Sequence, residues 1–383
     1  MTRRRALLSL ALASSLTVLP AASAPAVETV PGMPPVVDPT NIYSETTANK
    51  LLPELATLPP RAYVPLLKAN AVWVIDVATL KVIDKFKVGI NPQHVVPSWD
   101  LKTLWVTNNA EGRPDGTLTP IDAVTGKPGK AVAVDDPYNM YFTPDGKSAV
   151  VVAEALKRLD FRDPHTLALQ GSVHAPKCGG INHGDFSMDG KYLVMTCEYV
   201  SRLAKIDWIN RKVLGYLTLP DNGIPQDIRL SPDGKLFYVA DLRAGGVHLL
   251  DGDAFKLVGF IKTGVGTHGL YPSRDTTKLY VVNRGFSRIG GKAKQGEGSV
   301  AVIDFAARKA VATWPIPGGS PDMGNVTADG KHLWLSGRYD DVVYVIDTTS
   351  GEVRTIPVGR EPHGLTIWPQ PGRYSLGHTG NMR

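Results

Sequence analysis

Two short apolar runs flank a polar turn in Ile224-Pro-Gln-Asp-Ile-Arg-Leu-Ser-Pro-Asp-Gly-Lys-Leu-Phe-Tyr-Val-Ala-Asp241. The Asp-Gly pair at 233–234 supplies the positive φ that a tight hairpin needs. The stretch therefore predicts two antiparallel strands joined by a short turn.

Copies of this hairpin recur along the chain. Related segments begin at Pro92, Pro137, Ile181, Gly266, Pro321 and Pro362. Equivalent positions fall at 94, 139, 183, 227, 268, 322 and 363, with spacings of 45, 44, 44, 41, 54 and 41 residues. Each hairpin is followed by a second pair of apolar runs. A period of 40 to 50 residues with four strands per repeat predicts an all-β chain, a seven-bladed β-propeller with four-stranded blades.

The repeat is out of phase with the chain ends. Strands are expected near 62–67, 71–76 and 80–87, and the last inner strand near 363–368. We therefore expect one closing blade shared by N- and C-terminal strands, which protects the sheet edges. The resulting organisation is an irregular N-terminal arm at 27–60, the propeller at 61–370 and a C-terminal tail at 371–383. Whether 373–377 pairs into the closing blade stays open.

The first 26 residues have the pattern of a secretory signal. Arg3-Arg-Arg5 precedes an apolar run from Ala6 to Val18 and small residues up to Ala26. The run is too short to span a bilayer, so no transmembrane segment is predicted and the protein is expected to be secreted or otherwise extracytoplasmic. General and twin-arginine export both remain open. Removing 1–26 takes away three arginines and no acid, so the formal charge falls from +6 to +3, and nucleic acid is not indicated.

The repeats resemble those of a known family. Val72-Trp-Val-Ile-Asp76, Leu279-Tyr-Val-Val-Asn283 and Ser231-Pro-Asp-Gly-Lys-Leu-Phe-Tyr-Val-Ala240 are similar to the YVTN-type repeats of YncE-like propellers. That group also resembles the haem d1 propeller of cytochrome cd1 nitrite reductases. The resemblance covers 61–370 and implies the fold, but such propellers serve as enzymes, binding proteins and surface proteins. It leaves non-covalent haem d1 as a lesser alternative, held by a histidine such as His94, His183 or His268.

The residues that open the inner strands are all polar. In chain order they are His94, Asn139, His183, Asp227, His268, Asp322 and His363. Four of the nine histidines in the chain occupy these seven positions, which line the mouth of the central channel in a propeller.

We predict that this ring binds a transition metal. His268, Asp322, His363 and His94 lie on four consecutive blades, and imidazole with carboxylate suits copper, zinc or iron. Copper is favoured in an exported protein. Outer or second-site ligands are expected among His183, Asp227 and His378. The alternative is a solvated channel whose histidines are shared by duplication of the repeat.

A second ring follows the second strands of the blades. It comprises Asn109, Glu154, Glu198, Asp241, Arg284 and Arg338. Arg284 and Arg338 are predicted to hold an anionic small-molecule ligand or a cofactor carboxylate, with plain surface charge as the alternative. The insertion at 284–298 belongs on the same face, as a cover over the channel or as an idle loop.

Two cysteines complete the candidate residues. Cys178 and Cys197 fall at the same end of one predicted hairpin, and export favours a disulfide between them. Thiolate ligation of a metal beside His183 is the competing interpretation.

Three hypotheses for function follow. The first is an exported propeller that binds a metal for redox or hydrolytic chemistry on a small molecule, which would make it a metal-dependent enzyme such as an oxidoreductase. The second is a non-enzymatic module that binds a protein, a cell-envelope ligand or nucleic acid. The third is a metal-free lyase or hydrolase with a channel histidine as base beside Glu198 or Asp241. Substrate and oligomeric state stay open.

Overall fold

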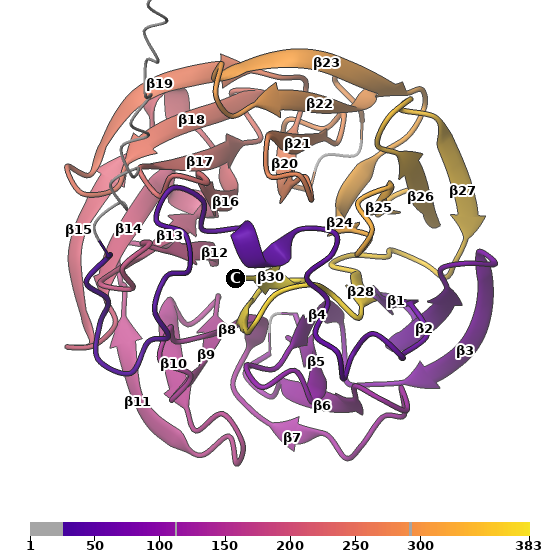
Figure 1. The fold of residues 1–383 in the computed structure, drawn as a ribbon, viewed down its shortest axis with the longest axis horizontal. Coiled ribbons are helices and arrows are strands. Elements are labelled where there is room, and N and C mark those ends of the chain that lie inside the picture. The colour runs from indigo at the N-terminus through magenta and orange to yellow at the C-terminus, as the bar shows by residue number, and fades with distance from the viewer. Residues whose placement is uncertain (1–25, 112, 291–292) are drawn as a thin grey trace, which may run out of the picture.

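A computed structural model describes residues 26–383 except 112 and 291–292. Residues 1–25, and with them the signal expected over 1–26, lie outside the described residues. The described chain forms seven sheets arranged around a central channel (Figure 1). The predicted seven-bladed propeller with four-stranded blades is confirmed.

Short strands make up nearly all of the regular structure. In chain order they are β1 (Arg61–Leu66), β2 (Ala71–Asp76), β3 (Lys81–Lys87), β4 (Pro92–Pro97), β5 (Thr103–Asn108), β6 (Thr117–Asp122), β7 (Val132–Ala133), β8 (Pro137–Phe142), β9 (Ala149–Ala153), β10 (Arg158–Arg162), β11 (Leu169–His174), β12 (Ile181–Phe186), β13 (Leu193–Cys197), β14 (Arg202–Asp207), β15 (Lys212–Thr218), β16 (Pro225–Leu230), β17 (Leu236–Asp241), β18 (Gly246–Asp251), β19 (Lys256–Lys262), β20 (Thr267–Pro272), β21 (Lys278–Asn283), β22 (Gly298–Asp304), β23 (Lys309–Ile316), β24 (Pro321–Val326), β25 (His332–Gly337), β26 (Val342–Asp347), β27 (Val353–Pro357), β28 (Thr366–Trp368), β29 (Ser375–Gly377) and β30 (Asn381–Met382). The 3₁₀ turns are η1 (Ser44–Thr46), η2 (Glu198–Val200) and η3 (Pro220–Asn222).

The closing blade joins the two ends of the propeller. Its strand order is β28-β1-β2-β3, and the antiparallel register places Arg61 opposite Trp368. The inner strand therefore comes from the C-terminal part of the chain and the outer three from the N-terminal part, which confirms the expected closure.

The turn chemistry of the repeat explains the inner hairpins. At six of those described, a Ser or Thr hydroxyl donates to the Asp carboxylate two residues later. Between β16 and β17, Ser231 Oγ also accepts from the amide of Leu236 at 3.0 Å, and Gly234 takes φ +68°. These local bonds favour a turn over a continued strand.

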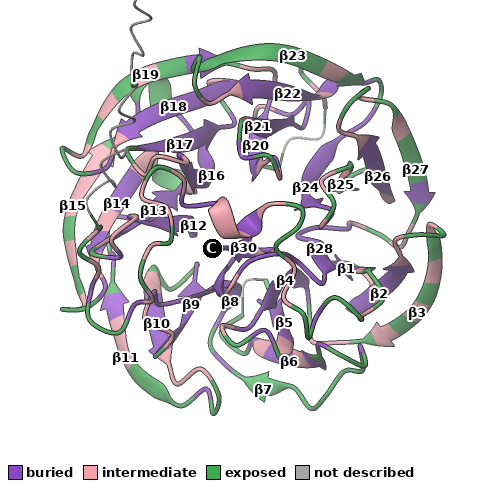
Figure 2. Cartoon of the chain, in the orientation of Figure 1, coloured by how far each residue is buried: buried purple, intermediate pink, exposed green. Residues whose placement is uncertain are grey.

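Burial decreases outward along each blade (Figure 2). All six residues of the inner strand β16 are buried, whereas the outer strand β3 alternates between exposed and half-buried residues. The core consists of apolar side chains packed between neighbouring blades. Within the described residues, no helix has the length and hydropathy of a bilayer span.

The N-terminal arm crosses the face that carries the Asp-Gly turns, called the closed face here. Val30 N donates to Asp189 O at 3.0 Å, and the Tyr43 hydroxyl donates to Leu230 O at 2.7 Å. Figure 1 shows the arm and its short turn η1 over the centre of the ring. The arm is thus irregular in secondary structure but fixed to several blades.

The C-terminal tail enters the channel instead of extending the closing blade. Strands β29 and β30 form a small hairpin that adds to the inner strand β8, with Gly377 opposite Tyr141. Gly377 has φ +90°, and a Cβ there would overlap the backbone of Met140. A glycine is therefore needed where the tail lies against β8, and the question left open for 373–377 is answered by this pairing.

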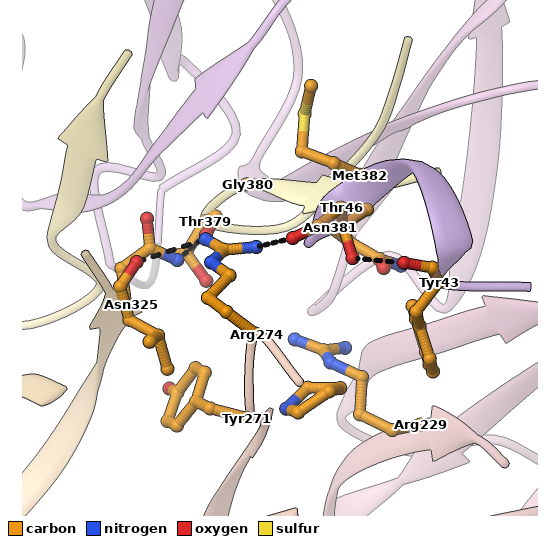
Figure 3. A pocket seen from close by; sticks show the side chains of 12 residues that line it. Tyr43, Thr46, Arg229, Tyr271, Arg274, Asn325, Thr379, Gly380, Asn381 and Met382 are labelled. Carbon is orange, nitrogen blue, oxygen red and sulfur yellow. Dashed lines mark hydrogen bonds between the residues drawn. The ribbon is translucent and has the colours of Figure 1, made fainter. Parts of the chain in front are cut away.

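Arm and tail meet at the closed face (Figure 3). The half-buried Arg274 donates from its guanidinium to Thr46 O at 3.2 Å and to Val326 O at 3.0 Å. The Asn325 amide donates to the carbonyl of Thr379. These groups surround a cavity of only about 40 Å³, so the N-terminal arm and the C-terminal tail together fill this end of the channel.

Cys178 and Cys197 form the expected disulfide, with Cα atoms 4.8 Å apart. Both residues are fully buried. Thiolate ligation beside His183 is therefore wrong for this structure, since neither sulfur is free.

Candidate functional site

A local irregularity marks the start of the inner strands. The pairing of β4 with β5 changes register between Pro92 and His94, and the pairing of β16 with β17 changes between Pro225 and Ile228. The inner strands β8, β12, β20 and β24 show the same shift. Bulges of this kind re-aim side chains beside functional sites. They occur where the repeat places its ring of polar residues.

Five imidazoles converge in the channel, and we call them the histidine cluster: His94, His183, His268, His363 and His378. The ring centroids of His183 and His378 are 4.5 Å apart, and those of His94 and His363 are 4.9 Å apart. His94 also lies 5.4 Å from His378, and His183 lies 6.3 Å from His268. All five side chains are buried. His94, His183 and His268 lie at the starts of β4, β12 and β20, and the tail contributes His378. His363 lies three residues before β28, so the inner strand expected near 363–368 is shorter in the structure.

One part of the cluster has the spacing of a metal site. His183, Asp227 and His378 each offer a donor atom within 4.8 Å of the other two. His378 Nε2 lies 3.0 Å from Asp227 Oδ1, and Asp227 is also paired with Arg229 at 3.1 Å. The side-chain amide of Asn139 lies 3.3 and 3.4 Å from the Nδ1 atoms of the two imidazoles. Asn139 therefore holds both rings in place.

A second group gathers around Asp322. Its carboxylate lies 3.0 Å from His268 Nδ1, 3.6 Å from His363 Nε2 and 3.6 Å from Arg284 Nε. Among the described residues, neither oxygen of Asp322 has a hydrogen-bond partner. The two ring nitrogens of His94 also have no hydrogen-bond partner. The four predicted ligands His94, His268, Asp322 and His363 thus lie near one another. The donor atoms lie closest together, however, in the set predicted as outer ligands, His183, Asp227 and His378. Ligand roles for both groups remain predictions.

The cluster is electrostatically prepared to ligate. Burial lowers the pKa of every imidazole below its ordinary value, and neighbouring histidines or arginines lower it further. Asp322 and Asp227 oppose this effect at His363 and His378 without reversing it. Although burial alone would raise the pKa of Asp227, Arg229 and His378 hold it well below its usual range. Neutral imidazoles and an ionised carboxylate are the forms that bind metal ions.

Above the cluster, on the face opposite the closed face, lies a pocket of about 320 Å³, called the mouth pocket. It is lined by Gln93, Asn109, Glu111, Asp136, Tyr138, Glu154, Ala155, Glu198, Tyr199, Gln226, His268, Arg284, Arg288, Ile289, Gly290, Arg338 and Tyr339. His268 belongs to both the pocket and the cluster. The insertion after β21 contributes Arg288 to Gly290, as expected for this face.

Both predicted arginines line the mouth pocket, but Asp241 does not belong to its ring of acids. The Asp241 carboxylate accepts from the amides of Ile224 and Ala244 and lies 3.0 Å from His248 Nε2. These bonds hold the loops at the ends of β16 and β17. A catalytic role for Asp241 has no support from this placement.

Some residues that line the pocket or support its acids were missed from the sequence. The Tyr199 hydroxyl donates to Glu154 at 3.0 Å, and Glu198 accepts from Asn182 at 3.0 Å and from Gln226 at 2.9 Å. Asn182 and Gln226 each precede an inner-strand residue of the polar ring. Their shared position in the repeat, one residue before the polar ring, could have identified them from the sequence.

Glu154 gives the pocket a measurable pH dependence. Burial, with the nearby charge of Glu198, raises its pKa from 4.5 to about 8. Between those values the folded state binds more protons than the unfolded state, so this group makes stability fall as pH rises. Glu154→Gln should therefore stabilise the protein by on the order of 3 kcal/mol at pH 8.5 and little at pH 5.

Thermal unfolding of the wild type and E154Q from pH 5 to 9 measures this effect. Glu352, an exposed glutamate of the loop before β27, gives the control substitution Glu352→Gln, which should change nothing across this range. A gap between wild type and E154Q that stays constant with pH would contradict the raised pKa of Glu154.

A family model described as a YncE-like β-propeller matches residues 29–371, nearly the whole described chain. The chain belongs to the YncE-like β-propeller family. The resemblance noted in its repeats is thereby confirmed. No curated protein matches this YncE-like chain.

Solved structures share the fold of this YncE-like propeller at low identity. The periplasmic gluconolactonase PpgL of Pseudomonas aeruginosa is 18% identical, with a TM-score of 0.64 over 82% of this chain and 99% of that one. The dihydro-haem d1 dehydrogenase NirN is 16% identical, with a TM-score of 0.58 over 84% and 81%. Hydrazine synthase of Kuenenia stuttgartiensis is 18% identical, with a TM-score of 0.57 over 74% and 92%. At this identity the likeness concerns the fold.

Proposed function

We propose that this YncE-like propeller binds one transition-metal ion, with copper favoured, through His183, Asp227 and His378, and uses it for redox or hydrolytic chemistry on a small molecule. The carrying observation is that these three buried residues bring donor atoms within 4.8 Å of one another. His94 is the nearest further candidate, because its ring contacts those of both histidines and its nitrogens lack partners among the described residues.

The donor chemistry supports the choice of ion. Two or three imidazoles with one carboxylate suit copper, zinc and iron better than magnesium or calcium, which prefer oxygen ligands. A bound ion of this kind supplies Lewis acidity or, for copper and iron, electron transfer. His268 connects the cluster to the mouth pocket, where a small molecule would lie. The Asp322 group, with His268 and His363, is the candidate for a second ion.

Elemental analysis and an absorption spectrum test the proposal on protein expressed with its own N-terminal segment and purified without chelator. About one equivalent of copper, zinc or iron is expected. The double variant His183→Ala/His378→Ala should lose that equivalent. The matched control, His165→Ala/His174→Ala, removes two exposed histidines and should keep it.

Three results would contradict the proposal. The first is metal retained by the His183/His378 variant with its fold intact. The second is no metal after reconstitution, which would favour the binding-module hypothesis. The third is a haem-like spectrum, which would favour haem d1, an alternative that rests on the likeness of fold alone.

We also propose an extracytoplasmic location. The disulfide between Cys178 and Cys197 is of a kind that persists in oxidising compartments. The similar gluconolactonase is periplasmic by its name. Labelling of intact cells and periplasmic extracts with an antibody to the protein tests this.

A further inference from the structure

The mouth pocket carries carboxyl groups on one arc of the ring and guanidinium groups on another. Glu154 and Glu198 follow β9 and β13 on neighbouring blades, whereas Arg284 and Arg338 follow β21 and β25 on two other neighbouring blades. The blade of β16 to β19 separates the two arcs on one side. Carboxyl groups and guanidinium groups therefore face one cavity from different directions.

The two arcs are not joined by direct ion pairs among the described residues. The ion pair that Arg284 makes among the described residues is with Asp322, at 3.6 Å, and not with Glu154 or Glu198. Glu154 instead accepts from Tyr199, and Glu198 accepts from two side-chain amides. Both carboxyl groups are thus held in place by neutral partners and not by the arginines.

The arginine arc has hydrogen-bond donors to spare. Arg284 is only 6% exposed, and one of its Nη atoms donates to the Tyr339 hydroxyl at 3.2 Å. Its Nε atom lies 3.6 Å from Asp322 Oδ1, which is too far for a hydrogen bond, and among the described residues neither this atom nor Nε of Arg338 has a hydrogen-bond partner. A buried guanidinium with a free donor favours an anionic acceptor, above all a carboxylate.

We infer that the mouth pocket binds a small zwitterion, with its carboxylate on Arg284 and Arg338 and its ammonium group on Glu154 and Glu198. A simple anion would satisfy the arginines but face two carboxyl groups. A simple cation would meet the reverse conflict, and only a molecule with both charges satisfies both arcs. Tyr138 and Tyr199 line the same pocket and add aromatic faces near the ammonium group.

The inference names a class of small molecule for the pocket beside the proposed metal site, and binding of that molecule does not require the metal. His268 lines the pocket and belongs to the histidine cluster, so a bound zwitterion would lie beside the proposed ion. The raised pKa of Glu154 supports the arrangement. Near pH 7 this carboxyl group holds a proton, and an incoming ammonium group would displace it. Binding should therefore release up to about one proton.

Titration calorimetry tests the inference on full-length protein, both metal-free and copper-loaded. The probes are glycine, β-alanine, 4-aminobutyrate and 6-aminohexanoate, whose charges lie progressively farther apart. The best ω-amino acid should bind at least about 10-fold more tightly than the fatty acid and the alkylamine of the same length, as two charge-assisted contacts replace one. Buffers with different heats of ionisation count the released proton.

Variants assign the two ends of the ligand. Arg284→Gln with Arg338→Gln should weaken the zwitterion and the fatty acid at least about 10-fold, while Arg354→Gln, on the exposed outer strand β27, should change neither. Glu154→Gln should abolish proton release and weaken the zwitterion but not the fatty acid. Near-UV circular dichroism checks that each variant is folded.

Equal affinity for the zwitterion and the fatty acid would overturn the inference and leave a simple anion site. No binding of any probe, in either metal state, would overturn it as well. Zwitterion binding by protein that takes up no metal would support it while contradicting the proposed metal function. Metal uptake without probe binding would do the opposite, so the two proposals fail separately.

Discussion

Removing residues 373–383 is expected to lower the free energy of unfolding by roughly 5 kcal/mol, because the tail fills the channel. Tyr374, Leu376 and Met382 are each at most 5% exposed. Burial of an apolar side chain of this size contributes about 1.5–3 kcal/mol. Urea unfolding of full-length and truncated protein, followed by tryptophan fluorescence, measures the difference.

The truncation also removes His378 and should abolish metal binding. His378→Ala separates the two effects, since it deletes one imidazole and keeps the hairpin of β29 and β30. This variant should lose the metal while keeping most of the stability, because Asp227 retains Arg229 as a partner. A truncated protein with an unchanged unfolding midpoint would show that the tail is not docked in solution.

The propeller itself could be predicted from the sequence, because the residues that specify each hairpin lie close together in the chain and recur in every repeat. The Ser-Pro-Asp-Gly turn at 231–234 contains its own hydrogen bonds, and the same pattern recurs around the ring. The phase of the repeat was enough to predict the closing blade. The disulfide could also be anticipated, because two cysteines at the same end of a hairpin lie close enough for their Cα atoms to meet the distance that a disulfide requires.

The tail could not be placed in this way. Residues 373–383 carry no repeat, and their position depends on tertiary contacts, such as Gly377 against β8 and Arg383 paired with Asp185 at 3.0 Å. Nothing near them in the sequence specifies these partners. The tail nevertheless brings His378 into the channel. The position of one residue in the closest donor group therefore could not be predicted from the sequence.

The grouping of the channel residues was equally hard to predict. Order around the ring favoured His94, His268, Asp322 and His363 as one set, but a side chain at a bulge does not follow simple strand alternation. In the structure Asp227 lies against His378, whereas Asp322 lies against His268 and His363. Sequence reasoning identified which residues line the channel, and three-dimensional packing decided which of them meet.

Asp227→Asn is expected to lower the free energy of unfolding by about 3 kcal/mol and to abolish metal binding. Asp227 is fully buried, pairs with the buried Arg229, and accepts from the amide of Leu270 on the neighbouring blade at 2.9 Å. The amide side chain would leave the guanidinium without its adjacent counter-charge. Removing one partner of a buried pair costs more than removing both. The double variant with Arg229→Met should therefore recover part of the stability, as measured by a double-mutant cycle.

Asp185 provides the control that separates stability from ligation. It is also fully buried, pairs with Arg383 and accepts from the amide of Leu230 at 2.8 Å, but it lies outside the donor group of His183, Asp227 and His378. Asp185→Asn should therefore destabilise the ring to a similar degree while the metal stays bound. Equal loss of metal in both variants would show that binding follows the rigidity of the ring, and retention in both would remove Asp227 from the ligand set. Only loss confined to Asp227→Asn fits a carboxylate that holds the ion directly.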